Sequence, residues 1–349
     1  MNDRSKVPTI NDVAEMAGVS KRTVSRVINR SDKVNEETRT KVQAIIEQLQ
    51  FTPNRQARGL AARRSFLIGL VYDVPTLFIN NVQKGILSVC GDAGYELVVH
   101  ACHIESDSLV DDVARFVDNA RLDGVVILPP VSEVEGVAET LNEVECPFVR
   151  FSSELSSEPW KEVVTNYLPA ITDMTNHLVE LGHSDIGFIS GPKNNISSQK
   201  RHETFVQALA QHDLTLPPDM VEEGAFNYES GVKAAERLLS REHRPTAIFA
   251  ANDEMAFGVM HVAHEMGLKI PDDLSLVGFD GTSFSSFVIP ALSTIRRQTD
   301  EMAQLGTKKL LALIDEGPDA ARDFETMVSP RFVPRKSTGP APLGQPLSF

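Results

Sequence analysis

The sequence has little cysteine, one tryptophan and no long uninterrupted run of apolar residues. Its three cysteines, Cys90, Cys102 and Cys146, are widely spaced and form no C-x-x-C pair, which favours reduced core thiols over disulfides or a zinc site. No stretch reaches the roughly 18 apolar residues of a membrane-spanning helix, and the polar N-terminus lacks the apolar core of a signal peptide. These absences predict a cytoplasmic protein with no membrane partner.

The motifs of common enzyme classes are also missing. No G-x-G-x-x-G follows a strand-like run, and neither G-x-x-x-x-G-K-[ST] nor G-x-S-x-G occurs. Residues 197–200 fit S-x-x-K without its companion motifs, and His261 and His264 lack the H-E-x-x-H context of a zinc site. We therefore expect neither an enzyme nor a bound metal or cofactor.

The uneven distribution of charge is the first positive indication of function. The chain has 349 residues and a formal net charge of −14, yet residues 1–64 hold 13 Lys or Arg against 7 Asp or Glu. The remaining residues hold 21 basic against 41 acidic side chains. A basic head on an acidic body is typical of a nucleic-acid-binding module joined to a body that avoids phosphate. The length exceeds the roughly 250–300 residues that one core usually serves, so several domains are expected.

Residues 9–29 have the pattern of two short helices joined by a tight turn. Thr9 can cap the first helix, Gly18 supplies the turn and Ser20 can cap the second helix, while apolar residues recur at helical spacing in both. The opposite face of the second helix carries long or polar donors, which are Lys21, Arg22, Ser25, Arg26 and Asn29. A helix that reads bases in the major groove needs such residues near its N-terminus. The alternative is a solvated face on an ordinary helical hairpin.

Two further segments bear on that choice. Residues 35–38 begin a third helix, so that residues 1–52 can form a three-helix head. Residues 53–64 follow as a basic linker, in which 54–60 would make about two helical turns, fewer than the roughly 12–15 residues an isolated helix needs. Gly59 weakens such a helix further. This segment should become helical only when it is held; the alternative is a flexible linker.

The segments Ala17-Gly18-Val19-Ser20, Thr23 to Asn29 and Asn54 to Leu60, taken together, closely resemble the LacI/GalR family of bacterial transcription regulators. The resemblance implies a repressor that binds a near-palindromic double-stranded operator as a homodimer. Paired hinge helices would enter the minor groove, with Leu60 as a wedge and the small Ala57 allowing close approach. Lys21, Arg22 and Arg26 should face base edges. The complete predicted DNA-binding set is Thr9, Ser20, Lys21, Arg22, Thr23, Ser25, Arg26, Asn29, Asn54, Ala57, Arg58 and Leu60.

From residue 66 onward, buried-strand and helix patterns alternate, which predicts an α/β body with parallel sheets. The strand-like runs fall into two groups, roughly 66–151 and 185–279, and indicate two doubly wound lobes behind the all-α head. The resemblance implies the periplasmic-binding-protein-like type I fold, with chain crossings near 163–166, 291–295 and 323–327. The first lobe would then hold residues 65–163 and 294–323, and the second 166–291 and 325–337. Residues 338–349 are expected to be a disordered tail, and their lack of a leucine heptad favours a dimer over a tetramer.

Polar residues at the ends of several predicted strands indicate a ligand site, because ligands of doubly wound sheets bind at the carboxyl ends of strands. Carboxylates and arginine can each bond two adjacent sugar hydroxyls, and aromatic faces can cover apolar C–H surface. The alternatives are helix capping for each Asp and a surface ion pair for Arg201. The predicted effector-binding residues are Asp73, Phe78, Arg201, Phe226, Asn252, Asp253 and Asp280. The resemblance supports an effector site, and Asn195, where purine-binding relatives carry an Arg, favours a mono- or oligosaccharide.

Two other classes of protein share the predicted body. A solute-binding protein would need an export signal and no basic head, the reverse of this chain. A sugar-modifying enzyme of the same fold class would have to show turnover.

Overall fold

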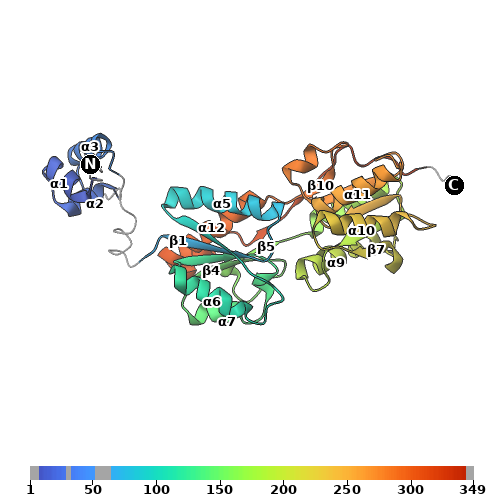
Figure 1. Ribbon diagram of the computed structural model, residues 1–349, viewed down its shortest axis with the longest axis horizontal. Coiled ribbons are helices and arrows are strands. Elements are labelled where there is room, and N and C mark those ends of the chain that lie inside the picture. Colours follow the sequence, from blue (N-terminus) through green and yellow to red (C-terminus); the bar gives the residue numbers. More distant parts are fainter. Residues whose placement is uncertain (1–7, 29–32, 52–63, 343–349) are drawn as a thin grey trace, which may run out of the picture. The chain divides into compact units, whose positions relative to one another are not determined.

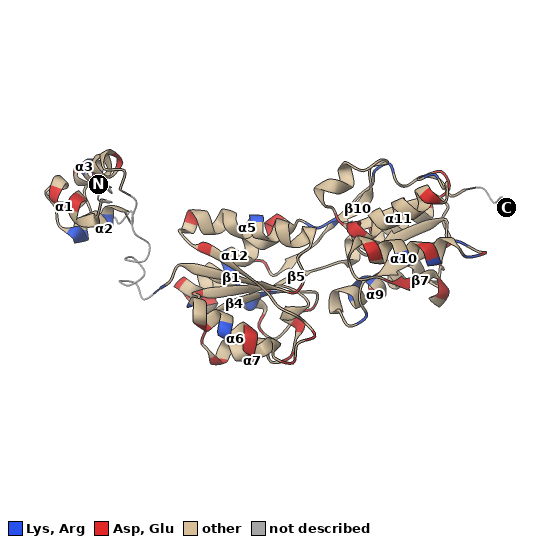
Figure 2. Cartoon of the chain, in the orientation of Figure 1, with Lys and Arg blue, Asp and Glu red and all other residues tan. Residues whose placement is uncertain are grey.

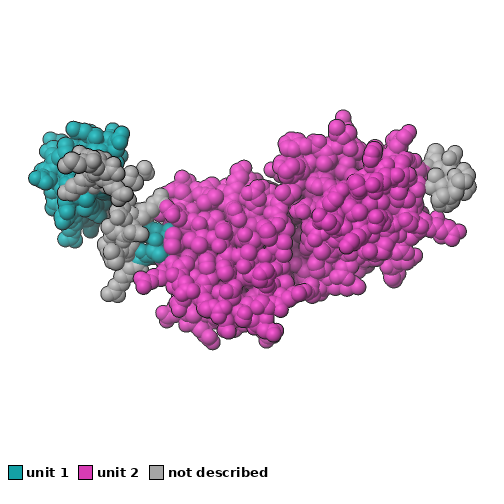
Figure 3. Space-filling model, viewed as in Figure 1, with its two compact units in different colours: residues 1–66 teal, residues 67–349 magenta. Residues whose placement is uncertain are grey.

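The computed structural model describes residues 8–28, 33–51 and 64–342. Its chain divides into two compact units, residues 1–66 and 67–349 (Figure 3). Among the helices described, none is long and apolar enough to cross a membrane.

Local hydrogen bonds cap helices of the head near the residues that the sequence predicts. These helices are α1 Ile10–Ala17, α2 Lys21–Ile28 and α3 Glu36–Gln48. The backbone N–H and the hydroxyl of Thr9 both donate to Asp12 Oδ2 at 2.7 Å, and Gly18 turns the chain with φ of 64°. The N–H of Thr23 donates to Ser20 Oγ at 3.1 Å, which caps α2.

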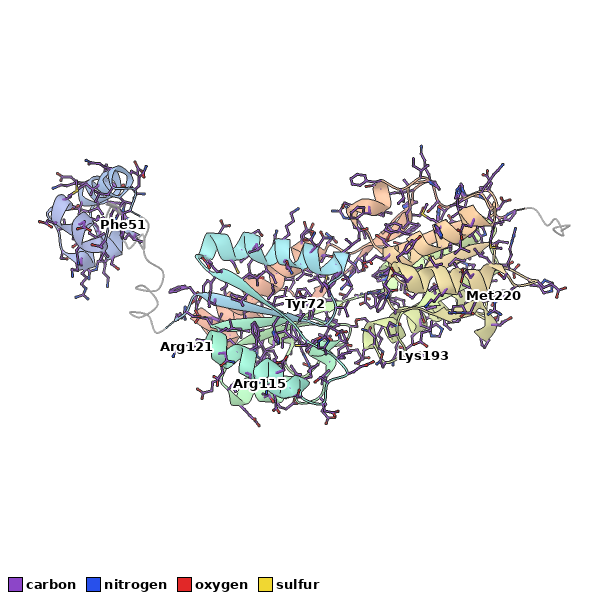
Figure 4. The ribbon with its side chains drawn as sticks, in the orientation of Figure 1. Phe51, Tyr72, Arg115, Arg121, Lys193 and Met220 are labelled. Carbon is purple, nitrogen blue, oxygen red and sulfur yellow. The ribbon has the colours of Figure 1, made fainter. Side chains whose placement is uncertain are left out.

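The apolar stripes of the three helices meet in one small core. Val13, Ala17, Val24 and Val42 are fully or almost fully buried there, and Phe51 closes the bundle behind α3 (Figure 4). The core is small because the unit is small, so the geometry of α2 depends on few contacts.

The first lobe is a six-stranded parallel sheet in the order β11-β5-β4-β3-β1-β2. Helices α5 and α12 cover one face, and α6 and α7 cover the other (Figure 1). The strands are β1 Leu67–Tyr72, β2 Glu96–Ala101, β3 Gly124–Ile127, β4 Phe148–Ser152, β5 Glu162–Thr165 and β11 Met327–Val328. The helices are α5 Leu77–Ala93, α6 Leu109–Ala120, α7 Val137–Glu143, α12 Thr299–Asp315 and the short α13 Pro318–Arg322, with 3-10 turns η1 Val131–Glu133 and η2 Pro159–Lys161.

The second lobe repeats this plan with the strand order β12-β10-β9-β8-β6-β7, in which only the short β12 is antiparallel to its neighbour. The strands are β6 Ile186–Ser190, β7 Val221–Glu223, β8 Ala247–Ala250, β9 Ser275–Asp280, β10 Ser293–Arg296 and β12 Arg331–Val333. The helices are α8 Leu168–Glu180, α9 Ile196–Ala210, α10 Tyr228–Leu239 and α11 Asp253–Glu265, with 3-10 turns η3 Pro218–Met220 and η4 Ser283–Ser286. The predicted α/β class with two doubly wound lobes is confirmed.

Two of the three chain crossings lie later than predicted. Strand β10 pairs with β9, Ser293 opposite Val277, so residues 294–296 belong to the second lobe and the chain crosses just before α12. Strand β11 pairs with β5, Met327 opposite Val164, so the last crossing lies between β11 and β12 instead of near 323–327. The resemblance implied these bounds, and strands this short carry too few residues for a periodic pattern to correct them.

The prediction of a disordered tail from residue 338 is wrong for residues 338–342. Ser337 is fully buried, and its carbonyl accepts the N–H of Leu276 at 2.8 Å. The carbonyl of Gly339 accepts hydrogen bonds at the start of β9, and the N–H of Ala341 donates to Leu181 O at 2.8 Å. These bonds satisfy backbone groups beside the second sheet, which is why a segment rich in Pro and Gly is ordered.

A buried ammonium group ties α12 to the first crossing. Lys309 is fully buried, and its Nζ donates to the carbonyls of Pro159 at 3.1 Å and Glu162 at 2.7 Å and to Thr326 Oγ1 at 3.1 Å. Burial lowers the pKa of Lys309 to about 8. One side chain thus joins α12, β5 and the segment that leads into β11.

Candidate functional site

The exposed face of α2 is basic at its start. Lys21 and Arg22 are exposed in the first turn, and Arg26 is half-buried one turn later (Figure 2). The hydroxyls of Ser20 and Thr23 lie 2.9 Å apart and support the cap. This arrangement presents two exposed cationic side chains at the end of the helix that a major groove would admit.

The other predicted DNA contacts divide into two groups. Thr9 has committed its hydroxyl to Asp12, and Ser25 is half-buried beside Arg26. Asn29, Asn54, Ala57, Arg58 and Leu60 lie outside the described residues.

A cavity of about 490 Å³ lies between the two lobes of the body. The furrow between them is visible in Figure 3, and Tyr72 and Lys193 lie on the two facing sides in Figure 4. The carboxyl ends of β1, β8 and β9 open into the cavity, as expected for parallel sheets. Six of the seven predicted effector residues line it: Asp73, Phe78, Arg201, Phe226, Asn252 and Asp280. Their contact with an effector stays a prediction.

Arg201 is a pocket residue, and it forms no surface ion pair with the part of the chain that the structure describes. Its side chain is 4% exposed, Nη1 donates to the carbonyl of Ala251 at 2.5 Å, and Cζ lies 4.0 Å from the ring centre of Phe279. The ring centre of Phe226 lies 5.5 Å from Cζ. The guanidinium therefore packs against aromatic rings, and among the described residues its Nε has no hydrogen-bond partner.

The aromatic wall at Phe226 depends on a glycine. A Cβ at Gly191 would lie 2.0 Å from Cζ of the Phe226 ring, so only glycine leaves room for it. Phe226 itself has φ of 58° and Asp280 has φ of 109°, both unusual for residues with a side chain. Backbone strain at two pocket residues marks a site whose geometry the surrounding fold holds in place.

Both polar atoms of the Asn252 side-chain amide form hydrogen bonds at the pocket wall. Its Oδ1 accepts the N–H of Met255 at 2.9 Å and caps α11, while Nδ2 donates to the carbonyl of Phe226 at 2.8 Å. Asn252 therefore caps a helix and also lines the pocket wall, where the sequence places it.

The structure contradicts the assignment of Asp253 to the effector site. The side chain is fully buried and absent from the cavity lining. Its Oδ2 accepts the N–H and the hydroxyl of Thr282 at 2.7 and 2.9 Å, and its Oδ1 accepts the Thr294 hydroxyl at 2.6 Å. Burial, with Asp280 nearby, raises the pKa of Asp253 to about 7. Asp253 braces the loop after β9 against β10.

Arg297, which the sequence analysis did not single out, belongs to the pocket. It follows β10, its side chain is 9% exposed, and its Cζ lies 4.1 Å from the ring centre of Phe78. Its Nη1 is 3.6 Å from Asp280 Oδ1. The Arg296-Arg297 pair was the only signal in the sequence, and the alternation of a strand would have identified the inward member if β10 had been recognised.

Two glutamates were also missed. Glu133 in η1 accepts the N–H of Ile196 on Oε2 at 3.3 Å, while its buried Oε1 has no partner among the described residues. Burial raises the pKa of Glu133 to about 7. Glu254 accepts the N–H of Leu77 at 3.4 Å, and burial raises its pKa as well.

Several of these contacts join the lobes across the cavity. Besides Glu133 with Ile196, the hydroxyls of Ser153 and Ser197 lie 2.7 Å apart, and Lys200 Nζ is 2.7 Å from Glu154 Oε1. All three partners in the second lobe lie in the first turns of α9, so any change in the angle between the lobes must break or remake these contacts.

One cluster of metal-ligating residue types lies outside the pocket. His100, Cys102 and Asp112 bring one ligand atom each within 4.8 Å of one another. His100 Nε2 and Asp112 Oδ2 already form a hydrogen bond of 2.8 Å, and burial raises the pKa of the Cys102 thiol to about 11. A buried thiol that resists ionisation is a core residue beside a hydrogen-bonded pair.

Comparison with known proteins decides between a regulator and its alternatives. The family model described as bacterial regulatory proteins, lacI family, matches residues 9–54, and that of the periplasmic binding protein-like domain matches residues 175–338. The chain is similar to the probable HTH-type transcriptional repressor ExuR of Bacillus subtilis (strain 168), 33% identical over 315 residues that cover 88% of this chain and 92% of the relative. The protein belongs to the lacI family.

Solved structures of lacI-family and related regulators agree with this assignment. The crystal structure of the Lac repressor dimer bound to operator and the anti-inducer ONPF matches with a TM-score of 0.77 and 28% identity, covering 96% of this chain and 100% of that chain. A transcriptional regulator CelR–cellobiose complex matches with a TM-score of 0.67 and 25% identity, covering 95% and 99%. This lacI-family protein is a DNA-binding transcriptional repressor with a ligand-binding body, and the prediction that it is not an enzyme is confirmed.

Proposed function

We propose that this lacI-family repressor binds a near-palindromic operator as a homodimer in the cytoplasm and that a saccharide in the interlobe cavity controls its affinity for DNA. The observation that carries the saccharide assignment is the lining of the cavity. Two aromatic faces, Phe78 and Phe226, stand among the carboxylates and guanidinium groups of Asp73, Asp280 and Arg201. Sugars present hydroxyl pairs and apolar C–H faces, and this lining offers partners for both.

The head supports operator binding through α2. Lys21 and Arg22 are exposed in the first turn, where long donors can reach guanine in a major groove. The Lac repressor dimer bound to operator shares the fold over nearly the whole chain, which supports the same mode of docking here. A two-fold dimer would place one α2 in each half of a near-palindrome.

An apolar surface on the second lobe supports the homodimer. Phe284, Phe287 and Ile289 are 50%, 74% and 94% exposed, and they follow one another closely in and after η4. Large apolar side chains gathered on a surface mark a protein contact, and a self-complementary patch produces a two-fold dimer.

Coupling between pocket and operator would pass through the angle between the lobes. A ligand bound to both lobes stabilises one angle, and the linker 53–64 of each subunit would follow the first lobe, to which it is joined. Such a ligand can change operator affinity only by the ratio of its affinities for the two arrangements.

The test is the Asp280→Ala variant in a gel shift with promoter DNA and candidate sugars. We expect normal operator binding without sugar and loss of the response to sugar, because Asp280 lies in the pocket and far along the chain from the head. Asp272→Ala, an exposed carboxylate before β9, is the matched control and should respond like the wild type. A normal response in Asp280→Ala would remove this carboxylate from the effector site.

A further inference from the structure

We propose that the effector carries an amine, so that the interlobe cavity takes an amino sugar, in its ammonium form, in preference to the corresponding neutral sugar. This inference rests on the proposed saccharide function of the same cavity. It comes from an excess of carboxylate groups over cationic groups in the cavity lining.

The first observation is the charge of the lining. Among the described residues that line the cavity, the only cationic side chains are two arginines, Arg201 and Arg297. Five carboxylates line the same cavity, and they belong to Asp73, Glu105, Glu133, Glu254 and Asp280. Acidic side chains therefore outnumber basic ones in the site, and a ligand that brings positive charge would reduce the imbalance.

The second observation is how these groups are paired. Of the five carboxylates, only Asp280 forms an ion pair within the part of the chain that the structure describes, with its Oδ1 3.6 Å from Arg297 Nη1. Arg201 lies near Glu133, but its Nη1 donates to the carbonyl of Ala251 at 2.5 Å. The two arginines therefore leave four cavity carboxylates without an ion-pair partner among the described residues.

Burial makes the missing positive charge unfavourable at two of these carboxylates. It raises the pKa of Glu133 to about 7 although Arg201 stands near, and it raises the pKa of Glu254 as well. Each accepts one backbone N–H across the lobes, Glu133 from Ile196 at 3.3 Å and Glu254 from Leu77 at 3.4 Å. A backbone N–H carries no net charge, and a carboxylate removed from water without a counter-charge is unfavourable. Both carboxylates therefore favour a cationic partner.

The spread of the carboxylates favours an organic cation over a metal ion. Among the described residues, the one group of three or more metal-ligating side chains close enough to hold an ion is His100, Cys102 and Asp112, which lies outside the cavity. The cavity carboxylates therefore suit a ligand that reaches them with several groups.

An amino sugar has such groups. Its ammonium offers three donors and a positive charge to a buried carboxylate, and its hydroxyls donate to the others. A neutral sugar supplies only the hydroxyls. The cavity of about 490 Å³ has room for such a compound, and Phe78 and Phe226 still offer their rings to its C–H surface.

Matched compounds test the proposal on the full chain. Isothermal titration calorimetry, at a pH that keeps the amines protonated, would compare D-glucosamine, D-galactosamine and D-mannosamine, each with its parent sugar and its N-acetyl derivative. We expect at least one amine to bind about ten times or more tighter than both of its neutral counterparts. Neutral compounds that bind as tightly as the amines would overturn the proposal and leave the saccharide function standing. A panel in which nothing binds would overturn both, and a parallel gel shift without binding to promoter DNA would count against the proposed operator function alone.

Glutamates of the cavity and of its surroundings provide the variant and its control. Glu133→Gln and Glu254→Gln together remove both buried charges and keep acceptors for the N–H groups of Ile196 and Leu77. We expect this double variant to bind the preferred amine at least about tenfold more weakly, at the level of its neutral counterparts. Glu265→Gln, exposed at the far end of α11 and outside the cavity lining, should keep the preference for the amine. An unchanged preference in the double variant would contradict the proposal, and the comparison of each amine with its N-acetyl derivative tests it without any substitution.

Discussion

Arg22 is exposed at the first turn of α2, where its guanidinium is free to reach a base edge. We expect Arg22→Ala to relax base preference at one position of each operator half-site, because a bidentate arginine–guanine contact contributes about 1–3 kcal/mol of discrimination. Gel shifts against operators substituted one position at a time would measure this. Lys41→Ala on α3, also exposed, is the control. If affinity fell equally for every sequence, Arg22 would instead contact phosphate.

Glu133 makes the stability of the body depend on pH. Its pKa in the folded protein is about 7, above the ordinary 4.5, so between these values the folded state holds a proton that the unfolded chain has released. Stability from this group is therefore complete below pH 4.5 and is lost as the pH rises to 7. Glu133→Gln keeps an acceptor for the N–H of Ile196 without the charge.

We expect Glu133→Gln to be more stable than the wild type at pH 8, by on the order of 1–2 kcal/mol or a few degrees in melting temperature, and equal to it near pH 4.5. Thermal unfolding across this range would measure the difference. The exposed Glu135→Gln is the control. A difference that does not change with pH would mean that the Glu133 carboxylate is not the titrating group.

Some residues of the pocket could be predicted from the sequence, and others could not. Asp280 and Asn252 follow apolar strands, so their place at a sheet edge could be predicted from the chain alone. Asp253 could not be told apart from Asn252, because only the tertiary fold decides which of two adjacent polar side chains faces the cavity. Glu133 lies in a 3-10 turn after a strand, and no periodic pattern marks such a position.

Among the elements, α12 is held to its neighbours by one buried side chain. Replacing Lys309 by Met keeps a long side chain but removes the three hydrogen bonds that Nζ donates to Pro159, Glu162 and Thr326. We expect a loss of about 2–4 kcal/mol in the free energy of unfolding, because the carbonyl of Glu162 would lose its ammonium donor in a buried site and the carbonyl of Pro159 would keep only the hydroxyl of Thr326. Urea unfolding followed by circular dichroism would measure it. Lys308→Met, the exposed neighbour, should change little, and equal effects of the two would contradict the assigned role.

The long elements could be predicted and the short ones could not. The predicted groups of strand-like runs, 66–151 and 185–279, contain β1 and β9, because each of these strands is long enough for its pattern to show in the sequence. Strands β7, β11 and β12 have two or three residues each. Such strands exist because a neighbouring strand offers them hydrogen bonds, and this information lies elsewhere in the chain.

For the whole molecule, the apolar surface in and after η4 is the proposed contact of the homodimer. We expect the double substitution Phe287→Glu and Ile289→Glu to weaken dimerisation at least about a hundredfold, since burying two carboxylates without partners costs several kcal/mol. Sedimentation velocity would show the mass falling toward the 38.3 kDa of one chain. Leu155→Glu, 56% exposed on the first lobe, is the control. A double variant that stays dimeric would place the contact elsewhere.

The late position of β11 affects how the protein is made. A ribosome synthesises the chain from its N-terminus. Two parts of the first lobe are nevertheless made late, helix α12 at residues 299–315 and the last strand of its sheet, β11, at residues 327–328. Helix α12 covers the apolar faces of α5, β3 and β4 in the finished protein. These faces therefore stay exposed while most of the second lobe is synthesised. At roughly 5–20 residues per second, that interval lasts many seconds. A translating chain of this kind is a natural client for chaperones, and a nonsense mutation anywhere between the first and last crossings would leave both lobes unfinished.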